Sequence, residues 1–287
     1  MCRTRSADIK PRMENADERT VAGFGDEWRR FDQRSLDDRE LRTLFDQYFA
    51  IFPWSSLRPD AVGFDLGCGS GRWAAMVATR VGRLHCVDAS AEALAVAERN
   101  LRGVDNVVLH RASVDAIPLV DGSMDFGYSL GVLHHVPSTA AGIRACVQKL
   151  KPGAPLLLYL YYAFDNRPAW FRGVWAMSDA GRRFVSRLPF PLRYAASQAI
   201  AAGVYLPLAR GAAMAERLGA DVRNVPLSAY RNRSFYVMRT DALDRFGTSL
   251  EQRFTAEQIR SMMERAGLDR VRFSEAPPFW CALGHRS

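Results

Sequence analysis

The feature that most constrains the fold of this chain is a short apolar run that ends in an acid and a glycine-rich turn. Residues 62–71 read V-G-F-D-L-G-C-G-S-G, in which Asp65 closes the apolar run and Gly67, Gly69 and Gly71 follow. Glycine adopts backbone conformations that other residues avoid, and it lets a ligand approach the main chain closely. The pattern therefore predicts a buried strand that hands over to a tight, ligand-contacting turn.

A second apolar run, at 84–87, also ends in an acid, Asp88, 17 residues after Gly71. A carboxylate at the tip of the next strand is placed to accept hydrogen bonds from ribose hydroxyls, which predicts a cofactor that contains adenosine. Gly69, Gly71 and Ala74 also fit the G-x-G-x-x-A pattern of a nicotinamide dinucleotide site. The charge of Asp65 favours S-adenosylmethionine instead, because it would repel a pyrophosphate and suit a cationic amino-acid group.

Strand and helix patterns alternate along the rest of the chain. Strands are predicted at 62–65, 84–88, 107–110, 124–130, 156–162, 271–273 and 280–283, and helices at 73–80, after Ser90, at 138–150 and after the Thr255-x-x-Gln258 capping box. Such alternation is typical of a parallel sheet with helices on both faces, whose ligands bind at the carboxyl ends of the strands. We expect an α/β fold with a Rossmann-like, doubly wound sheet of seven strands, parallel apart from a C-terminal antiparallel strand in a final hairpin.

Four segments are predicted around this sheet. Residues 1–20 read as a flexible tail, and 21–54 as an N-terminal helical cover with Trp28 as a wall of the cofactor cleft. Residues 55–162 and 250–287 form the cofactor-binding core, and 163–249 a helical insertion that serves as a lid. The first residues carry no apolar leader, and the five cysteines lack both a C-x-x-C pair and metal-ligand spacing. A cytoplasmic location and no metal site are therefore predicted.

The positive charge of the chain is concentrated in the predicted lid. Residues 161–235 contain 11 arginines and 4 acids, so they carry +7 of the net charge of +8. The uncharged run at 194–209 is too short, and too interrupted by Gly203 and Pro207, to span a membrane. A cationic, apolar lid suits an amphiphilic or anionic acceptor and predicts peripheral contact with a membrane. The alternative is a cap that packs its apolar face on the sheet and leaves its arginines in solvent.

Five motifs in order resemble those of class I S-adenosylmethionine-dependent methyltransferases, over residues 60–162 and 250–287. They are F-D-L-G-C-G-S-G-R at 64–72, V-D-A-S at 87–90, A-S-V-D-A-I-P at 112–118, M-D-F-G-Y-S-L-G-V-L-H-H-V at 124–136 and L-K-P-G-A at 150–154. The resemblance implies S-adenosylmethionine as the cofactor and methyl transfer as the activity.

The resemblance also implies contacts to the methionine end of the cofactor. Asp65 would meet the amino group of the methionine moiety, and Ser129 would lie at the same end. The backbone of the turn would lie against the cofactor at Gly67, Cys68, Gly69 and Gly71.

At the adenosine end, the resemblance implies that Asp88 binds the ribose hydroxyls and that Ala89 packs on the adenine. Val114 and Asp115 belong to the segment that lines the adenine. Asp115, or the amide of Ala116 beside it, would meet the adenine amino group. A solvated loop acid is the alternative interpretation of Asp115.

Methyl transfer from a sulfonium depends mostly on placing the nucleophile opposite the leaving sulfur, and a hydroxyl acceptor also profits from a general base. His134 and His135 are the candidates, because they follow the fourth predicted strand near the methyl end; either could instead pack within the turn. Tyr161 and Tyr162 could line the acceptor pocket or the core. The predicted function is methylation, at oxygen, of a small-molecule, glycan-lipid or lipid-like acceptor such as a lipid, a polyprenyl-linked sugar or a carrier-bound acyl chain.

Three alternatives stay open from the sequence. The basic lid would allow an RNA methyltransferase, but residues 125–129 read D-F-G-Y-S without the Pro-Pro of nucleic-acid N-methylases, and no separate RNA-binding module follows. Nucleic acid is therefore a disfavoured partner. A nicotinamide oxidoreductase would be favoured by a Tyr-x-x-x-Lys pair, which the chain lacks. A cofactor-binding scaffold without catalysis is the third, and the oligomeric state is not predicted.

Overall fold

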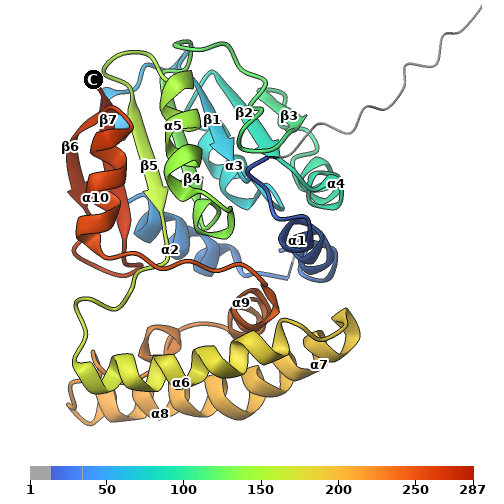
Figure 1. Ribbon diagram of the computed structural model, residues 1–287, viewed down its shortest axis with the longest axis vertical. Coiled ribbons are helices and arrows are strands. Elements are labelled where there is room, and N and C mark those ends of the chain that lie inside the picture. Colours follow the sequence, from blue (N-terminus) through green and yellow to red (C-terminus); the bar gives the residue numbers. More distant parts are fainter. Residues whose placement is uncertain (1–13, 34) are drawn as a thin grey trace, which may run out of the picture.

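The computed structural model describes residues 14–33 and 35–287, and a seven-stranded sheet lies at its centre. The strands are β1 (Val62–Leu66), β2 (Arg83–Asp88), β3 (Val107–Arg111), β4 (Phe126–Leu130), β5 (Pro155–Tyr159), β6 (Leu268–Phe273) and β7 (Cys281–Arg286). Their order is β3-β2-β1-β4-β5-β7-β6. Strands β1 to β5 are parallel, and β7 runs antiparallel to both β5 and β6 (Figure 1). The predicted fold class, with its antiparallel C-terminal strand, is confirmed.

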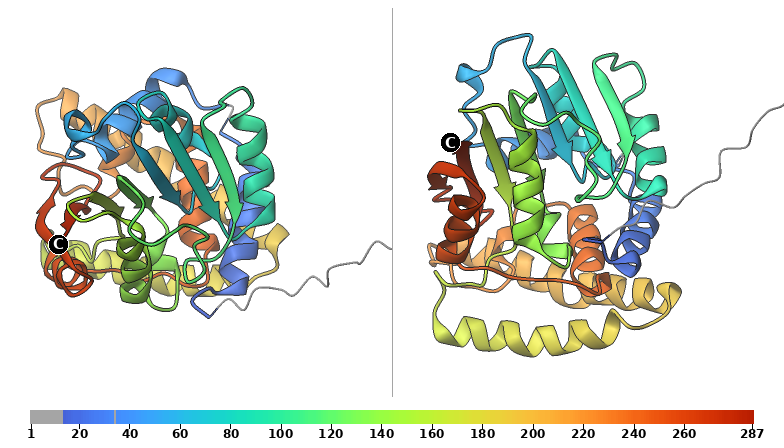
Figure 2. Two further views of the ribbon diagram at one scale, coloured as in Figure 1. Left: turned by 90° about the horizontal axis from the view of Figure 1, so that it is seen from above. Right: turned by 45° about the horizontal axis from the view of Figure 1, so that its top comes forward.

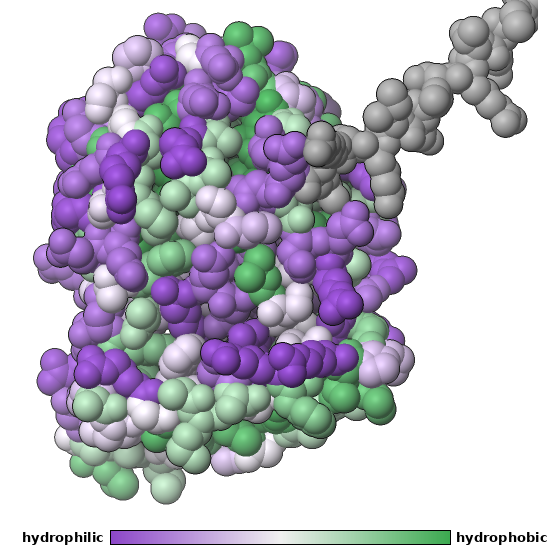
Figure 3. Space-filling view, in the orientation of Figure 1, coloured by the Kyte–Doolittle hydropathy of each residue, from purple (hydrophilic) through white to green (hydrophobic). Residues whose placement is uncertain are grey.

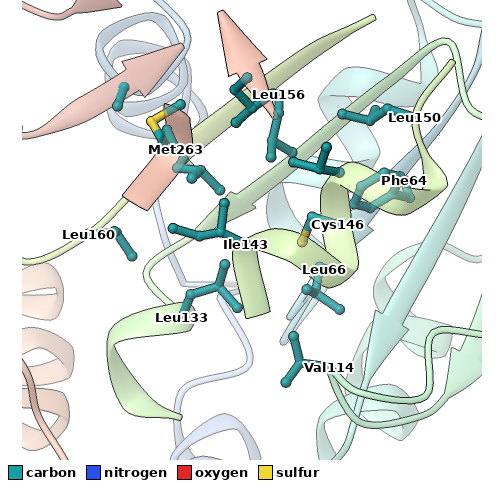
Figure 4. Packing of buried hydrophobic residues seen from close by; sticks show 14 of the residues in the cluster. Phe64, Leu66, Val114, Leu133, Ile143, Cys146, Leu150, Leu156, Leu160 and Met263 are labelled. Carbon is teal, nitrogen blue, oxygen red and sulfur yellow. The ribbon is translucent and has the colours of Figure 1, made fainter. Parts of the chain in front are cut away.

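Helices cover both faces of this sheet, as predicted. One face packs on α2 (Asp38–Tyr48), α3 (Arg72–Ala78) and α4 (Ala91–Asn100), the other on α5 (Thr139–Lys149) and α10 (Ala256–Arg265). On the second face, Phe64 and Leu66 of β1 lie in one apolar cluster with Ile143 and Cys146 of α5 (Figure 4). The predicted caps form as well: Ser90 caps α4, and Thr255 and Gln258 make a reciprocal capping box on α10.

The order of the strands reverses direction between β1 and β4. The chain proceeds from β1 outward to β2 and β3 on one side and then returns to place β4 on the other side of β1. Helices therefore leave these two neighbouring strands on different sides, which opens a crevice at the carboxyl ends of the strands. The glycine-rich turn follows β1 at this point, and residues 131–136 follow β4.

Glycines in β1 and β4 make room for aromatic rings from the neighbouring strand. A Cβ added at Gly63 would lie 2.3 Å from the Phe126 ring, and one at Gly127 would lie 2.3 Å from the Phe64 ring. We expect Gly63→Ala to lower the free energy of unfolding by about 1–3 kcal/mol, the usual cost of overpacking a core. Gly173→Ala is the matched control, because an added Cβ there meets nothing within 4 Å. Urea denaturation measures both, and equal stability of the two variants would contradict this packing.

The chain before the sheet differs from the prediction in two respects. Residues 1–13 of the predicted tail lie outside the described residues, whereas residues 14–20 are held in place and α1 (Glu18–Arg30) begins among them, capped by Asp17. The helical cover expected over 21–54 also breaks after α1 and resumes only with α2. In the break, Gln33 adopts a φ of 69° and its N–H donates to the Tyr236 hydroxyl (3.0 Å). Gln33 and Tyr236 are far apart in sequence, so their contact leaves no trace in the local pattern of apolar residues from which helices are predicted.

The predicted insertion at 163–249 is helical and forms a layer of its own. It contains α6 (Ala169–Val185), α7 (Phe190–Ile200), a π-helical turn at Ala201–Tyr205, α8 (Leu206–Arg217) and α9 (Phe235–Gly247). Figure 1 and the right-hand view of Figure 2 show α6, α7 and α8 below the sheet, with α9 between them and the core. We call residues 163–249 the lid. Tyr162 and Phe254 form a bridge, so the two ends of the lid lie side by side. No helix of residues 14–33 and 35–287 is long and apolar enough to cross a membrane.

Candidate functional site

The glycine-rich turn has the geometry that its sequence predicts. Gly67, Gly69 and Gly71 all have positive φ angles, of 80°, 54° and 76°, a region that favours glycine. Neighbouring side chains also leave no space for a Cβ. At Gly67 it would lie 2.2 Å from Val132, and at Gly69 it would lie 2.9 Å from the Trp28 ring. The turn therefore brings bare main chain against the segment after β4 and against α1.

Asp88, at the end of β2, ties this turn to the start of α4. The Gly69 N–H donates to its Oδ2 (2.9 Å), and the Ser90 N–H donates to its Oδ1 (2.9 Å). Burial raises the pKa of Asp88, and these backbone hydrogen bonds oppose the rise. Each carboxylate oxygen can accept more than one hydrogen bond. Asp88 can therefore support the turn and still accept hydrogen bonds from a ligand.

Asp65 is a buried acid without a full set of partners. Its side chain is only 2% exposed, and its Oδ2 has no hydrogen-bond partner among the described residues. Burial raises the pKa of Asp65 to about 8; the charge of Asp88 adds to the rise, and the nearby Tyr128 hydroxyl and Arg72 guanidinium oppose it. The group is thus largely protonated at pH 7, and it would ionise if a cation approached.

A cavity of about 130 Å³ lies at the carboxyl edge of the sheet, beside these groups. Five of the residues predicted from the sequence line it: Gly67, Asp88, Ala89, Val114 and His135. Trp28, predicted as a wall of the cleft, lines it too. The strand ends and α1 therefore enclose one site, whose lining is mostly apolar around two carboxyl groups, those of Asp88 and of the capping residue Asp17.

The sequence did not reveal the wall that the segment before α1 contributes. Asn15, Ala16 and Asp17 line the cavity. Asn15 fixes this wall through two reciprocal hydrogen bonds, in which its Nδ2 donates to the Ser138 carbonyl (3.0 Å) and the Ser138 N–H donates to its Oδ1 (2.7 Å). The two residues are 123 positions apart. Because this segment is polar, only its tertiary partners distinguish it from a loose tail.

Seven predicted site residues do not line the cavity: Asp65, Cys68, Gly69, Gly71, Asp115, Ser129 and His134. The hydroxyl of the fully buried Ser129 donates to the Leu66 carbonyl (2.9 Å), which joins β4 to β1. Asp115 accepts hydrogen bonds from the Ser113 hydroxyl and the Glu14 N–H. Burial alone would raise the pKa of Asp115, but these hydrogen bonds hold it below its usual value. Asp115 therefore anchors the wall before α1.

The two predicted base candidates lie together in different surroundings. His134 is fully buried, its ring stacks on Tyr161 at 3.8 Å between centroids, and neither ring nitrogen has a partner among the described residues. Burial lowers the pKa of His134 well below its usual value. His135 lines the cavity, and its Nδ1 lies 2.7 Å from the Leu250 carbonyl oxygen. A carbonyl only accepts, so Nδ1 carries the proton and Nε2 is left as an acceptor.

The lid supplies an acid beside His135. Asp244 of α9 places Oδ1 3.7 Å from Nε2 of His135, and the Tyr161 hydroxyl donates to its Oδ2. Burial raises the pKa of Asp244, and the positive charge that His135 would carry when protonated opposes the rise. Glu27 of α1 and Asp241 of α9 lie close by. Burial raises both of their pKa values, to about 6 for Asp241, and repulsion from Asp244 adds to each. The contact between core and lid therefore gathers one buried carboxyl group, Glu27, and two half-buried ones, Asp241 and Asp244.

Of the two predicted acceptor-pocket tyrosines, only Tyr161 joins this group. Tyr162 packs instead against Phe164, Phe279 and Trp280, away from the histidines. Asp244 was not predicted, since it lies 109 positions after His135 in a lid helix and belongs to no motif. Its role depends wholly on how α9 packs against the core.

Comparison with known proteins agrees with this geometry. Residues 64–158, from β1 to β5, match the family described as a methyltransferase domain. The chain contains a class I methyltransferase domain. The predicted family is thereby confirmed, and the cavity lies at the carboxyl edge of this methyltransferase domain.

The relatives cover the domain rather than the whole chain. The chain is 31% identical over 140 residues to a ubiquinone biosynthesis O-methyltransferase of Xanthomonas oryzae pv. oryzae, across 46% of this chain and 55% of that protein. It is 32% identical over 104 residues to an uncharacterized 37.1 kDa protein in a Streptomyces fradiae transposon, across 35% and 30%. The chain thus spans about half, or less, of the length of these curated relatives.

A solved structure shares the fold over most of the chain. A putative O-methyltransferase from Nostoc punctiforme superposes with a TM-score of 0.51 over 94% of this chain and 69% of that one. The two sequences are 12% identical, so the likeness concerns the fold alone. It extends beyond the methyltransferase domain into the segments that cover the cavity.

Proposed function

We propose that this protein is an S-adenosylmethionine-dependent methyltransferase that methylates an oxygen atom of a small or lipid-like acceptor. The proposal is carried by one observation. Residues 64–158, which match the methyltransferase domain, contain Gly67 of the glycine-rich turn, Asp88 and His135, and all three line one cavity. When bound, S-adenosylmethionine supplies a methyl group made electrophilic by its sulfonium sulfur.

The residues present fit this cofactor. Asp88 would accept hydrogen bonds from the ribose hydroxyls, and Ala89 and Val114 would pack on the adenine. The buried Oδ2 of Asp65 has no hydrogen-bond partner among residues 14–33 and 35–287, and a cationic amino group would provide one. The cavity of about 130 Å³ is smaller than the roughly 300–1,000 Å³ of most ligand pockets. We therefore expect α1 and residues 14–17 to move outward when the cofactor binds.

His135 is the proposed general base. Its Nε2 has no hydrogen-bond partner in the described part of the chain and could take a proton from an acceptor hydroxyl, while the Leu250 carbonyl holds the proton on Nδ1. The carboxylate of Asp244, 3.7 Å from Nε2, would stabilise the imidazolium that forms, and Tyr161 would hold Asp244 in position. The name of the Xanthomonas relative, an O-methyltransferase, supports oxygen as the atom methylated. His134, packed on Tyr161, would support the ring of its neighbour.

The lid supports an amphiphilic acceptor, because it combines arginines with exposed apolar side chains. Peripheral contact with a membrane is part of the proposal, since a lipid-like acceptor would be met at a membrane surface. The test is incubation of the full chain with methyl-labelled S-adenosylmethionine and a total lipid extract. Label should enter the solvent-extractable fraction and remain absent with His135→Gln. Label that appears only in added RNA would favour the RNA methyltransferase alternative.

Binding of S-adenosylhomocysteine at pH 7 should release close to one proton. Asp65, with a pKa of about 8, is roughly nine-tenths protonated at pH 7 before binding, and a cationic amino group beside it would keep it ionised. Because the folded pKa is raised, affinity should increase as the pH rises toward 8. Calorimetry in two buffers of different ionisation enthalpy measures the protons released. An equal release from Asp65→Asn would contradict the assignment.

A further inference from the structure

The outer surface of the lid gathers most of the exposed apolar side chains of this protein. Nine of the twelve large hydrophobic side chains that are exposed among the described residues lie between positions 170 and 218. Figure 3 shows apolar residues along the lower end of the molecule, over the lid helices. On α6, Trp170, Val174, Met177 and Phe184 are 48–79% exposed, and their spacing places them on one helical face.

A second apolar row runs along the π-helical turn and α8. Val204, Leu208, Met214 and Leu218 are 41–81% exposed. The first two and the last two are each four residues apart, so the members of each pair lie on the same side of the helix. The opposite side of this helix already has a partner, because Tyr205 packs on α9 in the small core of the lid. The two exposed rows are therefore not needed to hold the lid together. We call them the apolar face of the lid.

A groove lined by arginines borders this apolar face. It measures about 580 Å³, lies between α8 and residues 231–234, and takes its charge from Arg210, Arg217, Arg231 and Arg233. Met214, a member of the apolar face, forms part of its wall. Two acids lie beside it: Glu216 pairs with Arg231 (2.7 Å), and Glu40 accepts a hydrogen bond from the Ser234 N–H (2.8 Å). The exposed Arg217 has no hydrogen-bond or ion-pair partner in the described part of the chain. A net positive groove thus adjoins an uncovered apolar surface.

We propose that the groove binds the phosphate groups of anionic phospholipids while the apolar face rests at the headgroup boundary. Guanidinium groups match phosphate oxygens in charge and planar geometry. A helical surface with arginines beside Trp, Phe, Leu and Met is suited to lie in the plane of a membrane interface. Charge favours a membrane over a second copy of this chain, because two copies would bring like-charged grooves together. Membrane contact would bring the proposed methyltransferase to a lipid-like acceptor, so its purpose rests on the proposed function.

Co-flotation with vesicles tests the proposal and requires neither cofactor nor acceptor, so its failure is distinct from failure of methyl transfer. The full chain should float with phosphatidylcholine vesicles that contain phosphatidylglycerol, stay unbound with pure phosphatidylcholine, and be released by high salt. Arg217→Glu should weaken binding about 25-fold, because one basic charge at an anionic surface is worth about fivefold and the reversal counts twice. Met177→Ser and Leu218→Ser should also weaken it.

Two exposed residues of the core provide matched controls. Arg102→Glu makes the same charge reversal, and Val120→Ser removes an apolar side chain that is 75% exposed, against 79% for Met177. Both should bind vesicles like the unmodified chain, and circular dichroism should show all variants folded. Four results would each overturn the proposal. The first is equal binding to neutral and anionic vesicles, and the second is an equal loss of vesicle binding in Arg217→Glu and Arg102→Glu. The third is binding of inorganic pyrophosphate by a chain that does not float with vesicles. The fourth is a dimer that Met177→Ser abolishes, again in a chain that does not float.

Discussion

Asp88→Ala is expected to weaken the binding of S-adenosylhomocysteine by more than a hundredfold. Asp88 accepts the Gly69 N–H and the Ser90 N–H, both at 2.9 Å, and it also lines the cavity. Its removal would lose both the support of the glycine-rich turn and the acceptor for ligand hydroxyls. Hydrogen bonds to a charged group contribute roughly 1.5–3 kcal/mol each, so two lost bonds correspond to about 3–6 kcal/mol.

Titration calorimetry measures this loss, and two further variants separate its causes. Asp88→Asn keeps one acceptor oxygen and should lose less affinity than Asp88→Ala. Asp105→Ala removes an exposed acid of a loop in the same domain and should bind like the unmodified chain. Thermal unfolding shows whether each variant is folded. Unchanged affinity in a folded Asp88→Ala would mean that the ligand binds elsewhere.

His135→Gln is expected to lower kcat by a factor of about 10² to 10⁴ and to leave the affinity for S-adenosylhomocysteine almost unchanged. That factor is the usual contribution of a positioned general base. The loss should appear in kcat because His135 would act on the acceptor hydroxyl, whereas Asp88 and Asp65 would hold the cofactor. Initial rates at saturating cofactor and acceptor measure it.

Two further variants, at His85 and at Asp244, accompany His135→Gln. His85→Gln changes a half-buried histidine of β2 whose Nδ1 contacts His110 Nε2 (2.9 Å), and it should retain full activity. Asp244 is a positioning residue. Asp244→Asn would stabilise the imidazolium less, so kcat should fall, though by less than in His135→Gln. An unchanged kcat in His135→Gln would mean that cofactor and acceptor placement alone drives the transfer.

The sheet could be predicted almost completely from the sequence, because strand periodicity and turn chemistry are local. The turn at Gly67, Gly69 and Gly71 and the acid at Asp88 followed from the same local patterns. The caps at Ser90 and Thr255 did so too, since a capping side chain reaches backbone only two or three residues away.

What the sequence did not reveal depends on partners far apart in the chain. Asn15 reads as part of a polar tail, yet its reciprocal hydrogen bonds with Ser138 make it a wall of the cavity. Asp244 stands in a lid helix without any motif, and only packing brings it to His135. The basic character of the lid was visible in the sequence. The groove was not, because Arg217 and Arg233 meet only after α8 and the segment before α9 have packed.

Calorimetric titration of the full chain with S-adenosylhomocysteine, with NADH as the parallel ligand, tests the central claim most directly. A methyltransferase with this site should bind S-adenosylhomocysteine with micromolar affinity and show no heat with NADH. Binding of NADH alone would contradict the assignment of the cavity and would favour a dinucleotide site on the same glycine-rich turn.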